Sequence, residues 1–343
     1  MNAAETSPAV DSVLVFVGGD LIGDGLMKLP FVRALRHAFP RARITWCAGK
    51  HGSVYARALA PLVTGLIDEV IERAGFDRPL RFLLRRPLGG RRFDLVIDTQ
   101  NGVATALVLR RVRHGRFVSA AAGFLLSDAR PARGQRRPAS LVGRLLDLVA
   151  LASGAPAVAD APLSLPAAAR AAAAAALPDG PAYVGLAPGA GGRHKCWPLD
   201  RFVALAGGQA ARGRVPVFIL GPAEGEWAAR LAAEVPAALI PASDPASGRP
   251  GSSDPAFTIA LAERLAVAVA NDAGVGHLMA LADVPLVSLF GPTRPAKFAP
   301  AARRLAVIDA CDYGAAEMAA IPLGAVADAV ERLAGGQRGG AGT

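Results

Sequence analysis

Short apolar runs rich in β-branched residues alternate along the chain with longer stretches in which apolar residues recur every three or four positions. The short runs predict buried strands, and stretches such as residues 26–39 and 199–213 predict amphipathic helices. Strands that alternate with helices are typical of α/β proteins with parallel sheets. The predicted strands are residues 12–18, 43–49, 67–72, 94–98, 116–120, 182–188, 215–221, 237–242, 266–272 and 284–291.

The predicted strands fall into two sets, separated by a segment rich in Pro, Ala and Gly at residues 153–166. A chain of 343 residues is long for one core. We therefore predict two Rossmann-like domains, residues 1–160 and 161–343, with a last helix that is free to pack back on the N-terminal domain. Ligands of open parallel sheets bind at the carboxyl ends of strands, so the strand-to-helix loops are the places to look for function.

The first such loop, VFVGGDLIGDGLMKLP (residues 15–30), contains glycines and two aspartates. It does not match G-x-G-x-x-G, because Lys28 stands where the last glycine is required, and its carboxylates would repel a pyrophosphate. An NAD(P)-linked enzyme is therefore disfavoured. Glycines such as Gly23 would let a bulky acceptor approach the backbone. Asp24 lies where a helix begins, which favours an ionised carboxylate and makes it a candidate general base; a plain helix cap is the alternative.

Two glycine-rich loops follow strands of the second half. The amides of PGAGG (residues 188–192) and the ammonium of Lys195 are suited to bind a phosphate, and AGVGH (residues 273–277) begins a helix with free amides and a histidine, His277. Each feature alone has a plainer explanation, a surface loop with a chance lysine or a packed histidine. Their occurrence together in one half favours an anion site.

The charge is unevenly distributed. The whole chain carries +10, but residues 1–170 contain 24 Lys and Arg against 13 Asp and Glu, whereas residues 171–343 contain 14 against 15. The basic clusters at residues 77–92, 110–116 and 130–138 indicate either a solvated surface or a face toward an anionic acceptor or an anionic membrane. Nucleic acid is disfavoured as a partner, because aromatic residues do not interleave these clusters as stacking platforms for bases would.

The three cysteines lie far apart, without the spacing of a metal site, which suits a reducing compartment. The first residues do not have the pattern of a signal peptide, and no apolar stretch is long enough to form a membrane helix. We therefore expect a cytoplasmic protein, at the inner membrane face if its basic half docks there.

Four motifs occur in order along the chain: LIGDGLMKLPFVRALRHAFP (residues 21–40), FDLVIDTQN (93–101), PGAGGRHKCWPLDRF (188–202) and NDAGVGHLMALADVPLVSLFGPT (271–293). Together they resemble the signatures of glycosyltransferase family 9, which includes the ADP-heptose:lipopolysaccharide heptosyltransferases. The resemblance spans most of the chain and is more specific than any single glycine loop.

The resemblance implies a GT-B fold, with two Rossmann-like domains that face each other across a cleft, the acceptor on the first and the nucleotide-sugar on the second. It implies an inverting, metal-independent transfer, without a cofactor, of heptose from ADP-heptose to a lipopolysaccharide core or related glycan. Asp24 would be the base, and Lys195 would stabilise the departing diphosphate. Another GT-B enzyme, such as a nucleotide-sugar epimerase, and a non-catalytic sugar-nucleotide-binding protein remain as alternatives.

The resemblance also suggests which residues contact each substrate. Either Glu224 or Glu226 would bond the ribose hydroxyls, and of the two we favour Glu224. Two departures stand out: Ala273 replaces the usual Ser or Thr, and Ala104 replaces a frequent basic residue that would meet a carboxylate of the acceptor. The expected donor-binding residues are Pro188, Gly189, Ala190, Gly191, Glu224, Glu226, Asp272, Ala273, Gly274, Gly276 and His277. The expected acceptor-binding residues are Gly23, Gln100, Asn101, Arg110 and Arg113.

Overall fold

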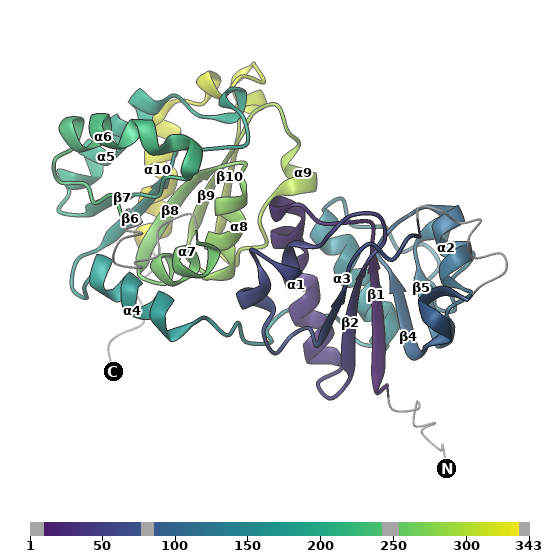
Figure 1. The fold of residues 1–343 in the computed structure, drawn as a ribbon. Coiled ribbons are helices and arrows are strands. Elements are labelled where there is room, and N and C mark those ends of the chain that lie inside the picture. The colour runs from purple at the N-terminus through teal and green to yellow at the C-terminus, as the bar shows by residue number, and fades with distance from the viewer. Residues whose placement is uncertain (1–9, 77–85, 242–253, 336–343) are drawn as a thin grey trace, which may run out of the picture. The chain divides into compact units, whose positions relative to one another are not determined.

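The computed structural model describes residues 10–76, 86–241 and 254–335, and the chain divides into two units, residues 1–164 and 165–343 (Figure 1). Part of the basic cluster at residues 77–92 lies outside the described residues. Each unit contains a parallel five-stranded sheet, which agrees with the predicted α/β class.

The first unit is built on a sheet with strand order β3-β2-β1-β4-β5. Its strands are β1 (Ser12–Val17), β2 (Arg43–Ala48), β3 (Glu69–Ile71), β4 (Arg92–Asp98) and β5 (Arg113–Ser119). Its α-helices are α1 (Ile22–Ala38), α2 (Val103–Leu109) and α3 (Leu141–Ser153). Short 3-10 helices are η1 (Val54–Ala56), η2 (Ala60–Val63), η4 (Pro87–Gly90) and η5 (Ala121–Phe124).

The second unit is built on a sheet with strand order β10-β9-β8-β6-β7. Its strands are β6 (Tyr183–Ala187), β7 (Val215–Phe218), β8 (Leu265–Asn271), β9 (Leu286–Phe290) and β10 (Leu305–Asp309). Its α-helices are α4 (Ala167–Ala176), α5 (Leu199–Ala210), α6 (Ala228–Glu234), α7 (Pro255–Ala262), α8 (Gly274–Leu281), α9 (Pro295–Phe298) and α10 (Leu323–Gly335). Short 3-10 helices are η6 (Arg193–Lys195), η7 (Pro222–Trp227), η9 (Ala310–Tyr313) and η10 (Met318–Ala320).

The central strands are buried on both faces, which explains their almost continuous apolar sequences. In β1 the residues from Val13 to Val17 are each no more than 2% exposed, and β8 is similarly apolar. Helix α1 packs beside α3 in the first unit (Figure 1). In the second unit α10 contacts β8, β9 and β10, with Val326, Ala329 and Val330 in the core. The described part of the last helix therefore contributes to the core of its own unit.

Two details of the strand prediction were wrong. Residues 237–241 form no strand, and Leu239 makes only an isolated bridge to Val217, while residue 242 lies outside the described chain. The fifth strand of the second sheet is instead β10, an edge strand beside β9, which the prediction missed. Because Leu305, Ala306 and Val307 are only partly covered, their sequence lacks the strong apolar run that marked the other strands.

In each sheet the direction of strand addition reverses between two central strands. In the first sheet β1 leads outward to β2 and β3, whereas its other neighbour, β4, leads to β5. In the second sheet the same reversal occurs between β6 and β8. At such a point the loops after the two strands diverge and leave a crevice at the carboxyl edge of the sheet. The loops singled out from the sequence follow these four strands.

Candidate functional site

The candidate residues of the first unit begin with the two aspartates of the loop after β1. Asp20 is buried and serves the structure: it forms an ion pair with Lys28 and accepts hydrogen bonds from Trp46 Nε1 and Ser53 Oγ, both at 3.0 Å. The two charged groups neutralise each other inside the unit, and further donors satisfy the carboxylate. Neither side chain is therefore available for a substrate.

Asp24 differs from Asp20 in its surroundings. It lies in the first turn of α1 and is partly exposed. Within the described parts of the chain no group donates a hydrogen bond to its carboxylate, and the N-cap residue is Leu21, so Asp24 is not the side-chain cap of this helix. An alanine Cβ at the neighbouring Gly23 would meet no atom within 4 Å, so the space beside Asp24 is open. The carboxylate therefore lies at the positive end of α1, with space beside it for a substrate hydroxyl.

The loop after β4 lies next to the Asp24 loop, because β4 pairs with β1. Asp98 ends the strand and is fully buried; burial raises its pKa to about 6, although the Gln100 amide and the Ser119 hydroxyl both donate to it. Asp98 thus fixes the turn that presents Gln100 and Asn101. Gln100 Oε1 lies 3.3 Å from the position of a Cβ on Gly18, so the two loops touch.

Arg110 and Arg113 do not belong to this group. Arg110 follows the last residue of α2, and Arg113 is the first residue of β5, where it pairs with Arg92 at the start of β4, six residues before Asp98. At about 3.3 Å per strand residue, roughly 20 Å of sheet separates them from the carboxyl edge. The structure therefore does not bring them together with Asp24, and Arg110 is also bonded to the carboxylate of Asp128 at 3.0 Å.

The candidate residues of the second unit lie in the loops after β6 and β8. The buried side chain of Asn271 joins them: its Nδ2 donates to the carbonyl of Pro188 at 2.8 Å, and its Oδ1 accepts from the amide of Trp197 at 3.1 Å. The Trp197 indole is buried and donates to the carbonyl of Ile321 at 3.0 Å. These bonds fix the path of the glycine-rich loop on both sides of Lys195.

Lys195 is held at the end of the neighbouring strand. Its ammonium lies 3.2 Å from Asp272 Oδ2, and the same oxygen accepts a hydrogen bond from Thr293 Oγ1 at 2.6 Å. The lysine side chain is 28% exposed and the aspartate side chain 13%. The ion pair therefore holds the Lys195 ammonium between the two loops. The Asp272 carboxylate orients the ammonium, which stays partly exposed to solvent.

Backbone amides without an acceptor add hydrogen-bond donors to this edge of the second sheet. Across residues 86–241 and 254–335, the amides of Gly189, Gly191 and Gly192 have no hydrogen-bond acceptor, and neither has that of Gly274 in the first turn of α8. Such amides are suited to bind an anion. The N-cap of α8 is Ala273, which makes no side-chain cap.

His277 lies in the same region, in α8, and is only 8% exposed. Burial lowers its pKa to about 4, and the nearby Asp272 carboxylate opposes this shift only in part. The imidazole is therefore neutral near pH 7 and can donate one N–H to an anion without adding a positive charge.

The two candidate glutamates occupy different environments. Glu224 is 9% exposed and its carboxylate lies directly against Gly189. Glu226 points outward, with its side chain 66% exposed in an ion pair with Arg193. Glu224 is therefore the residue that the structure brings to the glycine-rich loop.

The sequence of this chain matches the model of a known protein family. The model of the family described as glycosyltransferase family 9 (heptosyltransferase) matches residues 81–320, more than half of the chain. The chain belongs to glycosyltransferase family 9. No curated protein sequence matches it.

Solved structures of family 9 share the fold along almost the whole chain. A glycosyltransferase of family 9 from Veillonella parvula is 18% identical, with a TM-score of 0.69, over 96% of this chain and 99% of its own. The ADP-heptose lipopolysaccharide heptosyltransferase II of E. coli is 19% identical, with a TM-score of 0.64, over 95% and 99%. The E. coli heptosyltransferase WaaC, solved with ADP, is 22% identical, with a TM-score of 0.63, over 94% and 99%. The chain thus has the GT-B fold of these enzymes and is a glycosyltransferase.

Three residues that organise the candidate site of this family 9 member were not identified from its sequence. Asn271, Thr293 and Asp98 were not predicted to organise it, although all three lie in the family motifs quoted above. The one signal was a polar residue at the carboxyl end of an apolar strand, which applies to Asn271 and Asp98. In the described part of the chain no three His, Cys, Asp or Glu side chains lie close enough to hold a metal ion, and no helix has the length and apolarity to cross a membrane.

Proposed function

We propose that this family 9 enzyme is an inverting, metal-independent glycosyltransferase that moves heptose from ADP-heptose to a lipopolysaccharide core or related glycan. The observation that carries the proposal is the Asn271-bridged pair of loops, which presents Lys195 and free amides at one edge of the second sheet. Two related structures support the donor, because E. coli WaaC was solved with ADP and with ADP-2-deoxy-2-fluoro heptose.

In the donor half, the diphosphate lies against the amides of Gly189 to Gly191 and those at the start of α8. The ammonium of Lys195 faces the same anion, and His277 donates a neutral N–H. Glu224 accepts hydrogen bonds from the ribose hydroxyls, which its position beside Gly189 supports. This arrangement places fixed positive charge where the leaving group becomes more negative, and such charge stabilises the transition state more than the ground state.

In the acceptor half, Asp24 takes the proton of the acceptor hydroxyl. The resulting oxygen attacks the anomeric carbon, a new C–O bond forms there, and the bond to the β-phosphate oxygen breaks with its electron pair on the diphosphate. Attack from the opposite face inverts the anomeric configuration. The open space beside Gly23 and the absence of a described partner for the Asp24 carboxylate support this role. Gln100 and Asn101 contribute neutral polar groups to the acceptor.

The acceptor is an anionic glycan or glycolipid, as the net positive charge of the first half supports. Ala104 leaves the second helix without the basic residue that often meets an acceptor carboxylate in the family, and Arg110 and Arg113 lie at the opposite edge of the sheet. The acceptor group near Gln100 is therefore recognised by neutral donors at that position. We place the enzyme in the cytoplasm, at the inner membrane face where such an acceptor is presented.

A product assay tests this proposal. The enzyme is incubated with ADP-, UDP- and GDP-linked sugars, with and without a heptose-free inner-core acceptor, and the nucleotides and glycans are separated by mass spectrometry. We expect ADP release only with ADP-heptose and acceptor together, and an inverted linkage in the product. An acceptor-independent change in the sugar would indicate an epimerase, and donor binding without release in every mixture would indicate a non-catalytic binding protein.

A further inference from the structure

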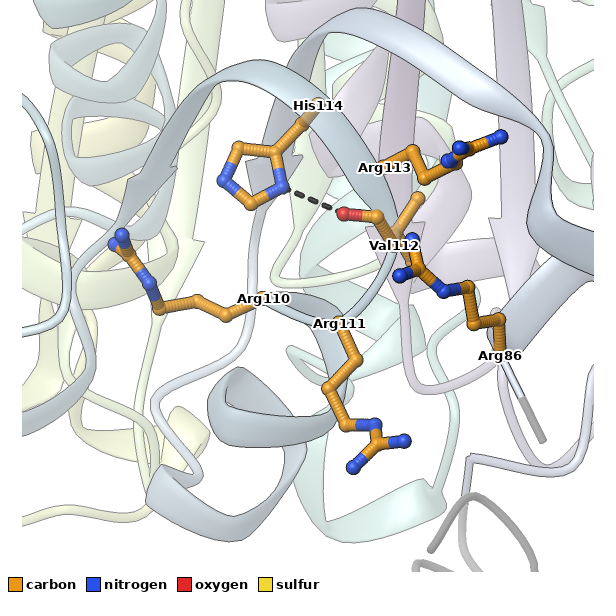
Figure 2. A pocket seen from close by; sticks show the side chains of 6 residues that line it. All are labelled: Arg86, Arg110, Arg111, Val112, Arg113 and His114. Atoms are coloured by element: carbon orange, nitrogen blue, oxygen red, sulfur yellow. Dashed lines mark hydrogen bonds between the residues drawn. The ribbon is translucent and has the colours of Figure 1, made fainter. Parts of the chain in front are cut away.

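A pocket at the turn between α2 and β5 is distinct from the candidate catalytic loops. It has a volume of about 360 Å³, within the range of roughly 300–1,000 Å³ that is typical of ligand pockets. It lies at the amino edge of the first sheet, since Arg113 opens β5 beside Arg92. Figure 2 shows Arg86 reaching from a separate segment toward Val112, while three arginines fan out from the turn. The lining residues are Arg86, Arg110, Arg111, Val112, Arg113 and His114.

Among the residues that the structure describes, the lining carries four arginines and no acidic side chain. Asp128 neutralises Arg110 from outside the pocket, at 3.0 Å. The negative end of α2 accounts for arginines at Arg110 and Arg111, which follow its last turn. It does not account for Arg86, which comes from another segment, or for Arg113, which belongs to a strand. The structure thus explains the charges of Arg110 and Arg111 but not those of Arg86 and Arg113. A bound phosphate would reduce the repulsion among the four guanidinium groups, because arginine forms bidentate hydrogen bonds with phosphate oxygens.

Exposed apolar side chains adjoin this basic cluster. Val103 and Leu107 on α2 are 47% and 52% exposed, and they are spaced four residues apart on the helix face that continues to Arg110. Leu125, which is 68% exposed, is close to the same arginine, because Arg110 donates to the carbonyl of Leu126 at 2.5 Å. A surface with arginines beside exposed aliphatic residues fits the boundary between lipid headgroups and acyl chains.

We propose that this surface, formed by the arginine pocket and by Val103, Leu107 and Leu125, docks on a membrane that contains anionic phospholipid. A lipid phosphate occupies the pocket, and the three aliphatic side chains enter the interface. The inference rests on the proposed placement of the enzyme at the inner membrane face and names the surface that makes this contact, although neither glycosyl transfer nor the chemistry of the acceptor is needed to test it. It assigns part of the net positive charge of residues 1–170 to one surface at the amino edge of the first sheet, whereas Asp24 lies at the carboxyl edge.

Vesicle binding tests the proposal. Sedimentation is measured with vesicles of phosphatidylglycerol and phosphatidylcholine and with vesicles of phosphatidylcholine alone. We expect the wild-type protein to prefer the anionic vesicles, and the preference to weaken as salt is added. Each arginine at an anionic surface contributes about fivefold in binding, so Arg86→Gln with Arg113→Gln should lower the partition coefficient about 25-fold. Leu107→Ser with Leu125→Ser retains the charge and should also weaken binding.

A matched control removes the same charge elsewhere. Arg303→Gln with Arg332→Gln changes two exposed arginines of the second unit and should change vesicle binding less than about threefold. Equal losses in both arginine pairs, or no preference for anionic vesicles, would overturn the proposal. So would inorganic phosphate binding without vesicle binding, or tighter binding of an RNA oligonucleotide with the same dependence on Arg86 and Arg113. The thermal shift caused by ADP reports separately on the donor half and on folding.

Discussion

Replacing Gly189 by alanine should weaken nucleotide binding through the displacement of Glu224. A Cβ at this position would lie 2.4 Å from Glu224 Cδ and 2.7 and 2.8 Å from its two oxygens. These atoms are the end of a flexible side chain, so the carboxylate moves and the loop backbone keeps its place. The cost to stability is therefore small, whereas the carboxylate would no longer reach the ribose hydroxyls that we propose it binds.

The size of the effect follows from the hydrogen bonds that are lost. A hydrogen bond to a charged group contributes about 1.5–3 kcal/mol, which corresponds to roughly a 10- to 150-fold weaker Kd for ADP. Isothermal titration calorimetry measures this constant directly. Gly225→Ala is the matched control, because Gly225 adjoins Glu224 and an added Cβ would meet nothing within 4 Å. We expect the control to retain the wild-type Kd within about twofold.

A double-mutant cycle establishes whether Glu224 mediates the effect. If Gly189→Ala acts by displacing the carboxylate, it should cause little further loss of affinity in a Glu224→Ala protein, because the displaced group is then absent. Additive losses would show that the alanine blocks the nucleotide itself. An unchanged Kd for Gly189→Ala alone would refute the assignment of Glu224 to the ribose.

The remaining predictions concern stability. Lys28→Met should lower the free energy of unfolding of the first unit by about 3–5 kcal/mol in urea titrations, because Asp20 is left buried without its partner; a loss below about 1 kcal/mol would contradict this. Ala273→Ser should raise stability by about 1 kcal/mol by capping α8, and an unchanged urea midpoint would show that no cap forms. The low pKa of His277 means that the wild-type second unit has its full stability above about pH 6.5 and loses about 3 kcal/mol as the pH falls toward 4, because the unfolded state binds the extra proton. His277→Gln should remove this part of the pH dependence, and identical pH profiles would exclude a buried neutral imidazole.

The sequence predicted most of the fold because most strands are buried on both faces. β1 and β8 are almost entirely apolar, so their pattern alone identifies them. The edge of the second sheet was harder to predict. Strand β10 is partly exposed, so its sequence shows only a weak apolar pattern. The apolar run around Leu239 led to a strand prediction, but that residue forms only one isolated bridge.

The site was predictable where chemistry is carried by loop composition and not where it depends on pairing across the sheet. Glycine content marked both donor loops, but the bond from Asn271 to Pro188 joins residues 83 positions apart and has no local signal. The choice between Glu224 and Glu226 also required the fold, because their spacing in sequence says nothing about which one is buried. Arg110 and Arg113 were expected to contact the acceptor, and their distance from Gln100 became visible only in the fold, where β4 runs from Arg92 beside Arg113 to Asp98 at the other edge of the sheet.

The role of Asp24 as the base that activates the acceptor is tested most directly by Asp24→Asn, which keeps the size of the side chain and removes its basicity. The measurement pairs kcat for acceptor-dependent ADP release with the Kd of the donor. We predict that kcat falls by about 10²- to 10⁴-fold while the donor Kd changes less than about threefold, because Asp24 belongs to the first unit and the loops that we propose to hold the diphosphate belong to the second. A variant that turns over at the wild-type rate would contradict the account.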